Sequence, residues 1–242
     1  MPDCADSTRF ILIGTSHPGN VGAAARAIKV MGFIDLVLVA PRFEDVLRHA
    51  DALAMASGAT DVLERARVVP TLADALDGIS YACATAMTPR DFGPPARAPR
   101  ELFGELAPSA HRVAFVFGSE RYGMSNDDVY RCHVALSIPT LPDYGSLNLA
   151  QAVQLIAYDW RQALGGFAVE PRTPDVQLAD GVAVQGVLDH WQRTLVDIDF
   201  LDPAAPRKLM PRLQQLVNRA QLTDEEVHIL RGVARAVEKA RR

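Results

Sequence analysis

Three polar or glycine-rich loops hold most of the residues in this chain that could do chemistry. They cover residues 14–22, 117–123 and 143–150. Each loop lies between a hydrophobic run and a helix-like segment, and ligand sites of α/β proteins gather at strand-to-helix loops on one edge of the sheet. Asn20, Glu120, Ser146 and Asn148 lie in these loops. We therefore expect them to form one site from distant parts of the chain.

An arginine follows the first loop in an unusual setting. Arg26 lies within residues 21–28, which are otherwise small or apolar. Its planar fork of donors suits a phosphate or a carboxylate. An arginine can also face solvent and cover alanines with its stem. The pattern alone leaves both interpretations open.

The loop residues also have ordinary structural interpretations. Asn20 is a favoured residue at a helix N-terminus, and Glu120 could form an ion pair with Arg121. Ser146 and Asn148 could cap the helix that follows them. The functional hypothesis therefore depends on the three loops taken together.

The common nucleotide, metal and hydrolase motifs are missing from this sequence. There is no GxxxxGK[ST] phosphate loop, and residues 19–22 lack the GxGxxG spacing of a dinucleotide turn. The six histidines show no i,i+4 spacing, so no metal is expected. A serine nucleophile would favour a GxSxG elbow, which is also absent.

Composition indicates a globular protein of a reducing compartment. The chain has 242 residues, of which 49% are hydrophobic, enough for a sizeable core. No apolar run reaches the roughly 20 residues needed to span a bilayer, and the acidic N-terminus is unlike a signal peptide. The three scattered cysteines form no disulfide framework. We expect a cytoplasmic protein with no membrane partner.

The charge is unevenly distributed along the chain. The formal net charge is −4, but residues 203–242 carry nine Lys/Arg and four acids, which leaves −9 on the rest. A basic tail on an acidic body suits an RNA-binding appendage. It also suits a pair of ordinary solvated helices, and charge does not decide between them.

Hydrophobic runs and helical periodicity alternate through the first two thirds of the chain. Strands are expected at residues 9–15, 35–40, 67–69, 80–86, 112–117 and 133–138. Helices are expected at residues 20–31, 44–57, 71–76, 101–106, 125–131 and 146–164. Most strands are continuous apolar runs, typical of a parallel sheet buried on both faces, and the alternation indicates an α/β fold.

The α/β pattern ends near residue 165. We interpret residues 1–165 as a catalytic domain, 166–178 as a linker and 179–242 as a small all-helical extension. Residues 223–226, with the sequence TDEE, form a capping box that starts the last helix. The proline-rich segment 88–99, with Arg90 and Arg97 inside it, is either a lid that faces a substrate or a connector.

Taken together, the loops resemble the three signature motifs of the SpoU family of RNA ribose 2′-O-methyltransferases, in the SPOUT superfamily. The matching motifs are residues 15–27, 116–124 and 146–153. The resemblance covers residues 9–165 and, more loosely, the helical extension. It is closest to members that methylate cytidine or uridine at position 32 of the tRNA anticodon loop.

The resemblance implies a cofactor, a knot and a dimer. S-Adenosylmethionine would lie in a trefoil knot in the C-terminal part of the α/β domain. Its carried-over contacts are Thr85, Ala86, Met87, Gly118, Ile138, Gly145, Ser146 and Leu147. Family members are homodimers, so Asn20 and Arg26 are expected to act beside the cofactor of a partner.

The resemblance also assigns roles to the catalytic candidates, which are Arg26, Asn20, Glu120, Ser146 and Asn148. Arg26 matches the essential arginine of the family, and we expect it to hold a phosphate and stabilise developing alkoxide charge. Asn20, Glu120 and Asn148 would orient the ribose, Arg26 or the cofactor. Related enzymes often have Arg where this chain has Ser119, which affects contacts to the RNA backbone.

Several alternatives follow from the same residues. The closest is the same reaction on ribosomal RNA or at another tRNA position. A non-catalytic RNA-binding protein of this fold should have lost Arg26, Asn20 or the loop around Ser146, and all are present. An oxidoreductase would need a phosphate-binding glycine turn. We expect tRNA, and not DNA, as the nucleic-acid partner, since a ribose hydroxyl distinguishes RNA.

Overall fold

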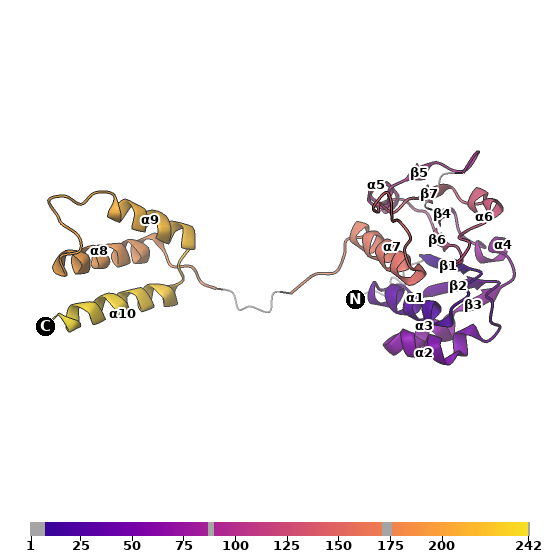
Figure 1. The fold of residues 1–242 in the computed structure, drawn as a ribbon, viewed down its shortest axis with the longest axis horizontal. Coiled ribbons are helices and arrows are strands. Elements are labelled where there is room, and N and C mark those ends of the chain that lie inside the picture. The colour runs from indigo at the N-terminus through magenta and orange to yellow at the C-terminus, as the bar shows by residue number, and fades with distance from the viewer. Residues whose placement is uncertain (1–7, 87–89, 171–175, 242) are drawn as a thin grey trace. The chain divides into compact units, whose positions relative to one another are not determined.

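The computed structural model of this chain describes residues 8–86, 90–170 and 176–241. Packing divides the chain into two compact units, which are Met1–Ala168 (unit 1) and Val169–Arg242 (unit 2). Figure 1 draws both units, with unit 1 built on a sheet and unit 2 wholly helical.

Unit 1 contains a seven-stranded sheet in which every described pairing is parallel. The strand order is β3-β2-β1-β6-β4-β7-β5. The strands are β1 (Arg9–Ile13), β2 (Asp35–Val39), β3 (Arg67–Val69), β4 (Tyr81–Thr85), β5 (Ala96–Arg97), β6 (Val113–Phe117) and β7 (Val134–Leu136). The predicted α/β class is confirmed. The trefoil knot stays a prediction.

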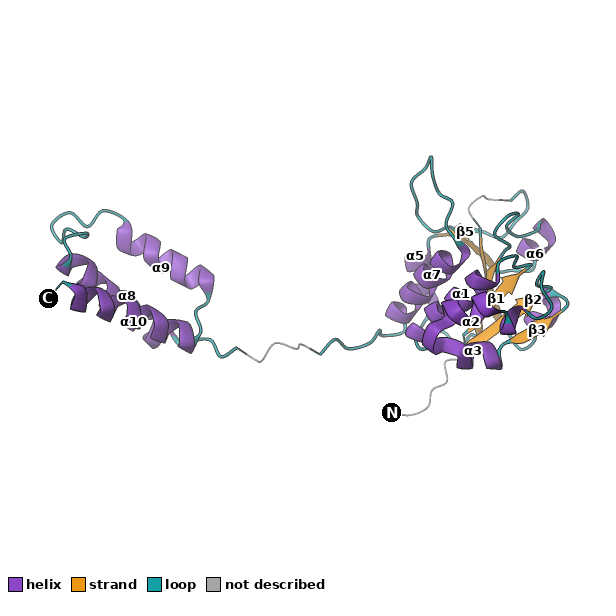
Figure 2. Ribbon diagram, turned by 60° about the horizontal axis from the view of Figure 1, so that its bottom comes forward, coloured by secondary structure: helices purple, strands orange, loops and turns teal. Residues whose placement is uncertain are grey.

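Helices cover both faces of the sheet (Figure 2). One face packs against α1 (Pro18–Val30), α2 (Ala50–Ala56), α3 (Thr60–Arg65), α5 (Pro99–Leu106) and α7 (Leu149–Ala163). The other face packs against α4 (Leu72–Ala75) and α6 (Asn126–Tyr130). Because both faces are buried, the central strands are apolar along most of their length, which explains the continuous hydrophobic runs in the sequence.

The larger of the two apolar layers contains a group of aromatic rings. Phe10 and Phe115 lie 5.5 Å apart between ring centroids, and Trp160 of α7 meets Phe115 edge-on at 5.6 Å. The indole nitrogen of Trp160 donates to Thr8 Oγ1 at 2.8 Å. These contacts fix α7 on the sheet and thereby place the loop before it.

One local prediction was wrong, and other short elements were not predicted. The single helix expected at residues 44–57 is divided into a short turn η1 (Val46–Arg48) and α2, because His49 has an extended backbone and caps α2 by accepting from Asp51 N. The turn η2 (Ser57–Ala59) and helix α3 then follow without a prediction. The strand β5, inside the proline-rich segment, is two residues long and too short to leave a periodic signal.

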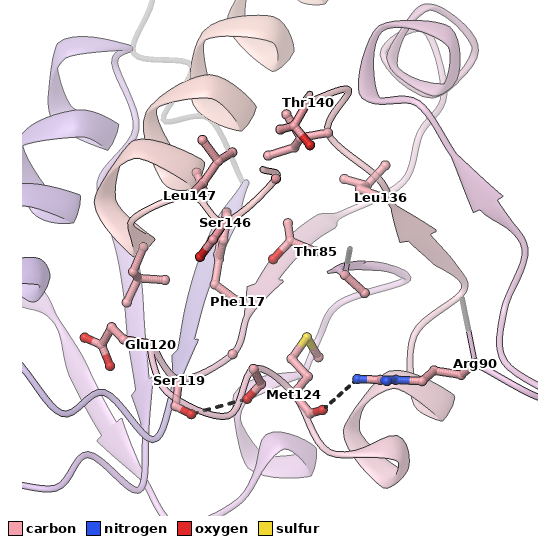
Figure 3. Close-up of a pocket in the computed structure, with 17 residues that line it drawn as sticks. Thr85, Arg90, Phe117, Ser119, Glu120, Met124, Leu136, Thr140, Ser146 and Leu147 are labelled. Carbon is pink, nitrogen blue, oxygen red and sulfur yellow. Dashed lines mark hydrogen bonds between the residues drawn. The ribbon is translucent and has the colours of Figure 1, made fainter. Parts of the chain in front are cut away.

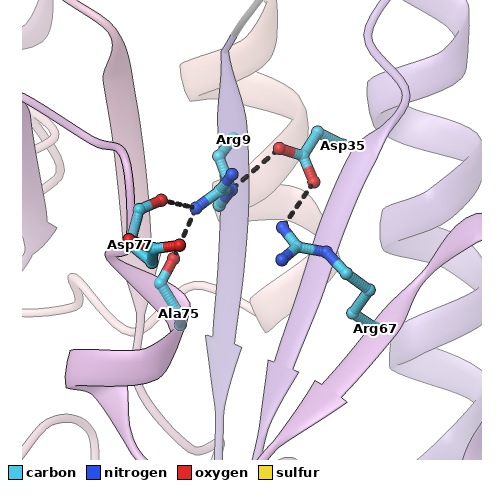
Figure 4. Close-up of polar contacts among 5 residues, drawn as sticks. All are labelled: Arg9, Asp35, Arg67, Ala75 and Asp77. Carbon is cyan, nitrogen blue, oxygen red and sulfur yellow. Dashed lines mark hydrogen bonds and ion pairs between the residues drawn. The ribbon is translucent and has the colours of Figure 1, made fainter.

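A charged cluster ties the amino ends of three strands together (Figure 4). Arg9 donates to Asp35 Oδ2 at 2.8 Å, and Arg67 reaches Asp35 Oδ1 at 3.3 Å. Arg9 also donates to the backbone carbonyls of Ala75 and Asp77, both at 2.8 Å. We call these residues the base network, which joins β1, β2 and β3 to the end of α4.

Unit 2 consists of α8 (Gly181–Asp197), α9 (Leu209–Ala220) and α10 (Asp224–Ala240) around a small apolar core. The predicted capping box is present, since Thr223 accepts from Glu226 N and Glu226 accepts from Thr223 N. The predicted helical extension is confirmed. Across the described ranges of both units, we find no helix with the length and apolar character that a membrane span requires.

Candidate active site

Hydrogen bonds connect the three predicted loops beyond the carboxyl ends of the strands. Glu120, after β6, accepts from the backbone nitrogen and the hydroxyl of Ser16, both at 2.9 Å, and from Asn20 Nδ2 at 2.9 Å. Asn148 donates from Nδ2 to Asn20 Oδ1 at 3.0 Å. We call these four residues the loop network. It joins segments separated by as many as 128 positions in the sequence.

The loop network keeps Glu120 ionised. Partial burial alone would raise the pKa of this carboxyl group, but hydrogen bonds from Asn20 and Ser16 outweigh burial and hold the pKa below its ordinary value. All these donors are neutral. Glu120 is therefore a carboxylate stabilised by hydrogen bonds, and the predicted alternative of an ion pair with Arg121 is wrong. Arg121 instead lies over the ring of Tyr122, 5.3 Å from its centroid.

The residue at which α1 begins determines whether Asn20 caps the helix or bonds to the other loops. The helix begins at Pro18, two residues before the predicted start, and its N-cap residue is His17. Proline suits the first helical position because its fixed φ is preorganised for the helix. Asn20 is thus inside the first turn and does not cap α1. Its side chain is free to bridge Glu120 and Asn148.

The start of α7 gives Asn148 two functions. Its Oδ1 accepts from Ala150 N at 2.9 Å as the N-cap of α7, and Gln151 completes the capping box. Its Nδ2 meanwhile donates to Asn20. The helix starts at Leu149, so Ser146 belongs to the loop before it and does not cap it.

A cavity of about 270 Å³ opens beside the loop network (Figure 3). It is lined by residues from the ends of β4, β6 and β7 and from the loop before α7. The structure places seven predicted cofactor residues on its wall, which are Thr85, Ala86, Gly118, Ile138, Gly145, Ser146 and Leu147. Glu120 lines the same cavity. Met87 lies outside the described residues.

The wall at Gly118 admits no side chain. A β-carbon there would collide with the backbone of Gly123 and Met124. The close approach arises because Ser119 and Gly123 exchange backbone hydrogen bonds at 3.0 and 2.9 Å, which folds the loop back on itself. This tight turn brings the backbone of residue 118 to the cavity and presents Glu120 at its edge.

A second depression, which we call the outer hollow, shares Ser119 and Glu120 with the cavity. Its other lining residues are Gly14, Ser16, His17, Arg42, Arg121 and Tyr122. Arg42, Arg121 and Tyr122 are exposed. Two arginines and an exposed aromatic ring are suited to phosphate contacts and base stacking.

Arg26 is placed apart from the other candidates. It is exposed on α1 and lines neither the cavity nor the outer hollow, whereas Ala25 and Ala27 on either side are buried. The structure thus connects Asn20, Glu120 and Asn148 directly and places Ser146 on the cavity wall. It does not bring Arg26 to the cavity of its own chain.

Sequence reasoning gave no role to Arg42 or to Arg90. Arg42 follows β2, and its backbone nitrogen donates to Thr15 O at 3.0 Å, which holds it beside the first loop. Arg90 was noted in the proline-rich segment without a function, and it lines the cavity. No motif marks either residue. The position of each after a parallel strand was the one available signal.

Comparison with known proteins gives matches along nearly the whole chain. Residues 7–158 match the model of the SpoU rRNA Methylase family, and residues 182–242 match the C-terminal domain of tRNA methyltransferase TrmJ. The tRNA (cytidine/uridine/adenosine-2′-O-)-methyltransferase TrmJ of Pseudomonas aeruginosa strain UCBPP-PA14 is 41% identical. That match covers 98% of this chain and 96% of the relative.

Solved structures give the same result. The crystal structure of TrmJ from Zymomonas mobilis ZM4 matches with a TM-score of 0.80 and 31% identity, covering 96% of this chain and 99% of that one. A probable methyltransferase from Bordetella pertussis Tohama I matches with a TM-score of 0.62 and 50% identity. It covers 68% of this chain and 99% of its own.

Proposed function

Because the chain belongs to the SpoU rRNA Methylase family and matches TrmJ at its C-terminus, we propose that it methylates a ribose 2′-hydroxyl of tRNA. The observation that carries this proposal is the loop network beside the cavity, which unites the three loops that resemble the family motifs. The name of the P. aeruginosa relative states this activity for that protein.

The cofactor is S-adenosylmethionine, which when bound supplies a methyl group already activated on a sulfonium. The cavity wall fits such a ligand, because Ser146 offers a hydroxyl group and the hydroxyl oxygen of Thr85 can accept a hydrogen bond while its proton goes to Val116 O. Apolar residues Leu136, Ile138 and Leu147 suit the adenine ring. These residues, together with Ala86 and Gly145, would hold the cofactor.

The protein contributes alignment and removal of the hydroxyl proton. Positioning two reactants can contribute roughly 7–11 kcal/mol toward lowering a barrier. Glu120 is a positioning residue in this scheme, since it holds Ser16 and Asn20 at the mouth of the cavity. Asn148 fixes the opposite side of Asn20 and thereby couples α7 to the same geometry.

Arg26 acts from a second copy of the chain. Val30 on α1 and Leu155 and Tyr158 on α7 are large apolar side chains with 58%, 43% and 45% exposure, on two helices that pack together. Covering them in a homodimer is favourable. Such an interface would carry Arg26 of one protomer to the cavity of its partner, where it holds the phosphate next to the reacting ribose.

A complementation experiment tests this arrangement. Arg26→Ala and Glu120→Gln subunits, each expected to lose about 100-fold or more of the activity alone, are coexpressed with different tags and purified as the mixed dimer. If Arg26 acts on the partner, one of the two sites is intact, and the mixed dimer has about half the activity of the native dimer. An inactive mixed dimer would place Arg26 in the site of its own chain.

The RNA substrate is supported by the outer hollow and by unit 2. Arg42, Arg121 and Tyr122 lie next to Glu120, where an RNA chain entering the cavity would pass. The basic residues of positions 203–242 would bind more distant phosphates. We propose cytidine or uridine at anticodon-loop position 32 as the target, which the resemblance of the loops favours, and the cytoplasm as the location.

Methyl transfer to unmodified tRNA is the deciding assay. Labelled S-adenosylmethionine is incubated with tRNA and the native protein, and the modified nucleotide is mapped. We expect label on the ribose at position 32, and a loss of about 100-fold or more in Arg26→Ala. Lys29→Ala is the matched control, because Lys29 is exposed on the same helix and pairs with Asp61.

The same assay separates the alternatives. Label on ribosomal RNA but not on tRNA would move the function to the other substrate of this chemistry. Binding of both cofactor and tRNA without transfer would support a non-catalytic RNA-binding protein. Native protein that binds no S-adenosylmethionine would refute the proposed function.

A further inference from the structure

Arg90 lies in a tight turn whose backbone is fixed. Its carbonyl accepts from Gly93 N at 3.0 Å, and the next carbonyl, of Asp91, accepts from the hydroxyl of Tyr130 at 2.7 Å. The first bond closes the turn, and the second attaches it to α6. The position of the Arg90 side chain on the cavity wall is therefore set by the fold.

The guanidinium of Arg90 has few partners of its own. Its Nε is buried without a hydrogen-bond partner, one of two such side-chain atoms in the part of the chain that the structure describes. Its Nη2 donates to Met124 O at 3.5 Å, a long and weak contact (Figure 3). A buried donor without an acceptor costs free energy, so this arrangement is explained if a ligand supplies the acceptor.

The next two arginines along the chain form ion pairs within the protein. Arg97 meets Glu105 at 2.7 Å, and Arg100 meets Asp159 at 3.0 Å. Arg90 lies on the cavity wall instead, where Glu120 is the one acidic residue among the described lining residues. The bonds of that carboxylate go to Ser16 and Asn20. Among the described residues, therefore, no protein carboxylate pairs with Arg90.

We propose that Arg90 binds the carboxylate of the methionine part of S-adenosylmethionine. This inference rests on the proposed function, which puts that cofactor in the cavity. Its carboxylate is the single anionic group of the cofactor, and a guanidinium binds a carboxylate through two parallel hydrogen bonds. Binding would place the two carboxylate oxygens against the guanidinium of Arg90, whose hydrogen bonds with the protein are few.

The test compares two ligands that differ in one group. Decarboxylated S-adenosylmethionine retains the adenosine, the sulfonium and the amine but lacks the carboxylate. Affinities for both ligands are measured by calorimetry on native protein and on Arg90→Gln. We expect Arg90→Gln to weaken S-adenosylmethionine binding by about 10- to 100-fold and to leave the affinity for the decarboxylated ligand unchanged.

Two further variants serve as controls. Arg90→Lys keeps the charge without the planar fork and should give an intermediate affinity. Arg97→Gln removes a cation from the same segment and should bind both ligands like the native protein. Circular dichroism and thermal unfolding check that each variant is folded.

Three results would overturn the inference. Equal weakening of both ligands in Arg90→Gln would assign the residue to holding the Met124 loop. Unchanged cofactor affinity with weakened tRNA binding would assign it to an RNA phosphate. Unchanged affinity for every ligand would leave it without a binding role. In all three cases the native protein still binds S-adenosylmethionine, so the proposed function stands.

Discussion

The base network and the loop network lie at opposite ends of β1 and balance charge differently. In the base network, Arg9 and Arg67 share the carboxylate of Asp35, and Arg9 also donates from Nη1 to two backbone carbonyls. In the loop network, Glu120 is held by neutral donors alone. One end of the strand therefore pairs its charges internally, and the other keeps a carboxylate without a cation.

This difference separates a structural role from a functional one. Arg9 is 7% exposed, and a buried cation is tolerated because it is paired and hydrogen-bonded. Glu120 borders a cavity and an open hollow, so its negative charge is directed at whatever enters them. Groups whose environments shift their pKa beside a cavity are concentrated at functional sites. The predictions below change each network in turn and compare the effects on methyl transfer and on stability.

The largest effect is expected from Glu120→Gln. The variant replaces one acceptor oxygen with a donor, which then faces Asn20 or Ser16 and pushes the loops apart. A displacement of about 1 Å can reduce turnover by about 100-fold, and we expect a loss of that size in kcat/KM for methyl transfer. Single-turnover transfer to tRNA measures it.

Glu105→Gln is the matched control for that change. Glu105 is a carboxylate of the same unit that pairs with Arg97 at the surface. Its loss should leave methyl transfer within about twofold, as expected for an exposed ion pair. Native activity in Glu120→Gln would show that the loop network does not position the reacting groups.

For the base network we expect a loss of stability with little loss of methyl transfer, the reverse of the result for Glu120→Gln. Arg9→Met leaves the carbonyls of Ala75 and Asp77 without a donor and removes the buried partner of Asp35. We expect the free energy of unfolding of unit 1 to decrease by about 3 kcal/mol, with little change in activity per folded molecule. Urea unfolding followed by tryptophan fluorescence measures the stability.

Arg67→Ala completes this comparison at the exposed edge. The Arg67 contact to Asp35 is longer and more exposed than that of Arg9. Its loss should cost about 0.5 kcal/mol. A cost in Arg67→Ala as large as in Arg9→Met would mean that burial does not determine the strength of this network.

A smaller effect, on tRNA binding alone, is expected from the basic residues of unit 2. Arg212, Arg219 and Arg235 are exposed on α9 and α10. Replacing all three with Gln should weaken tRNA binding about tenfold near physiological salt and flatten its dependence on salt. Cofactor affinity should not change. Filter binding at several salt concentrations measures the effect, and an equal loss of cofactor affinity would contradict it.

The sequence predicted the architecture well because burial on both faces leaves an unmistakable pattern. Strand β6 is apolar at every position and β1 at every position after Arg9, and their ends placed the loops of Ser16 and Glu120 within two positions of where they lie. The convergence of the three loops followed from the rule for parallel sheets. The strand order and the pairing of β7 between β4 and β5 required the structure.

Individual side chains were harder to predict because their partners are distant in sequence. Asn20 was expected either to cap a helix or to orient a substrate, and the bond to Glu120 spans 100 positions. Arg90 resembles Arg97 in sequence context, yet only the fold reveals that one is paired and the other borders a cavity. Residue type limits what a group can do, whereas tertiary contacts decide what it does.

The smallest effect concerns acid stability, and it tests how Glu120 is held. Its pKa is lowered in the folded protein from the ordinary value of about 4.5, so ionised Glu120 favours the folded state above that pH. The advantage is lost as the pH falls through the folded pKa. The difference in unfolding free energy between native protein and Glu120→Gln should therefore be constant from pH 6 to 9 and decrease below about pH 4.5.

The same property limits the chemical role of Glu120. A carboxylate whose pKa is held low is a weak base, so Glu120 should not produce the pH dependence of methyl transfer between pH 6 and 9. Any rise in rate over that range should persist, with the same midpoint, in the residual activity of Glu120→Gln. Disappearance of that rise in the variant would show that Glu120 accepts the ribose proton. The contrast with the base network would then be one between a structural ion pair and a general base.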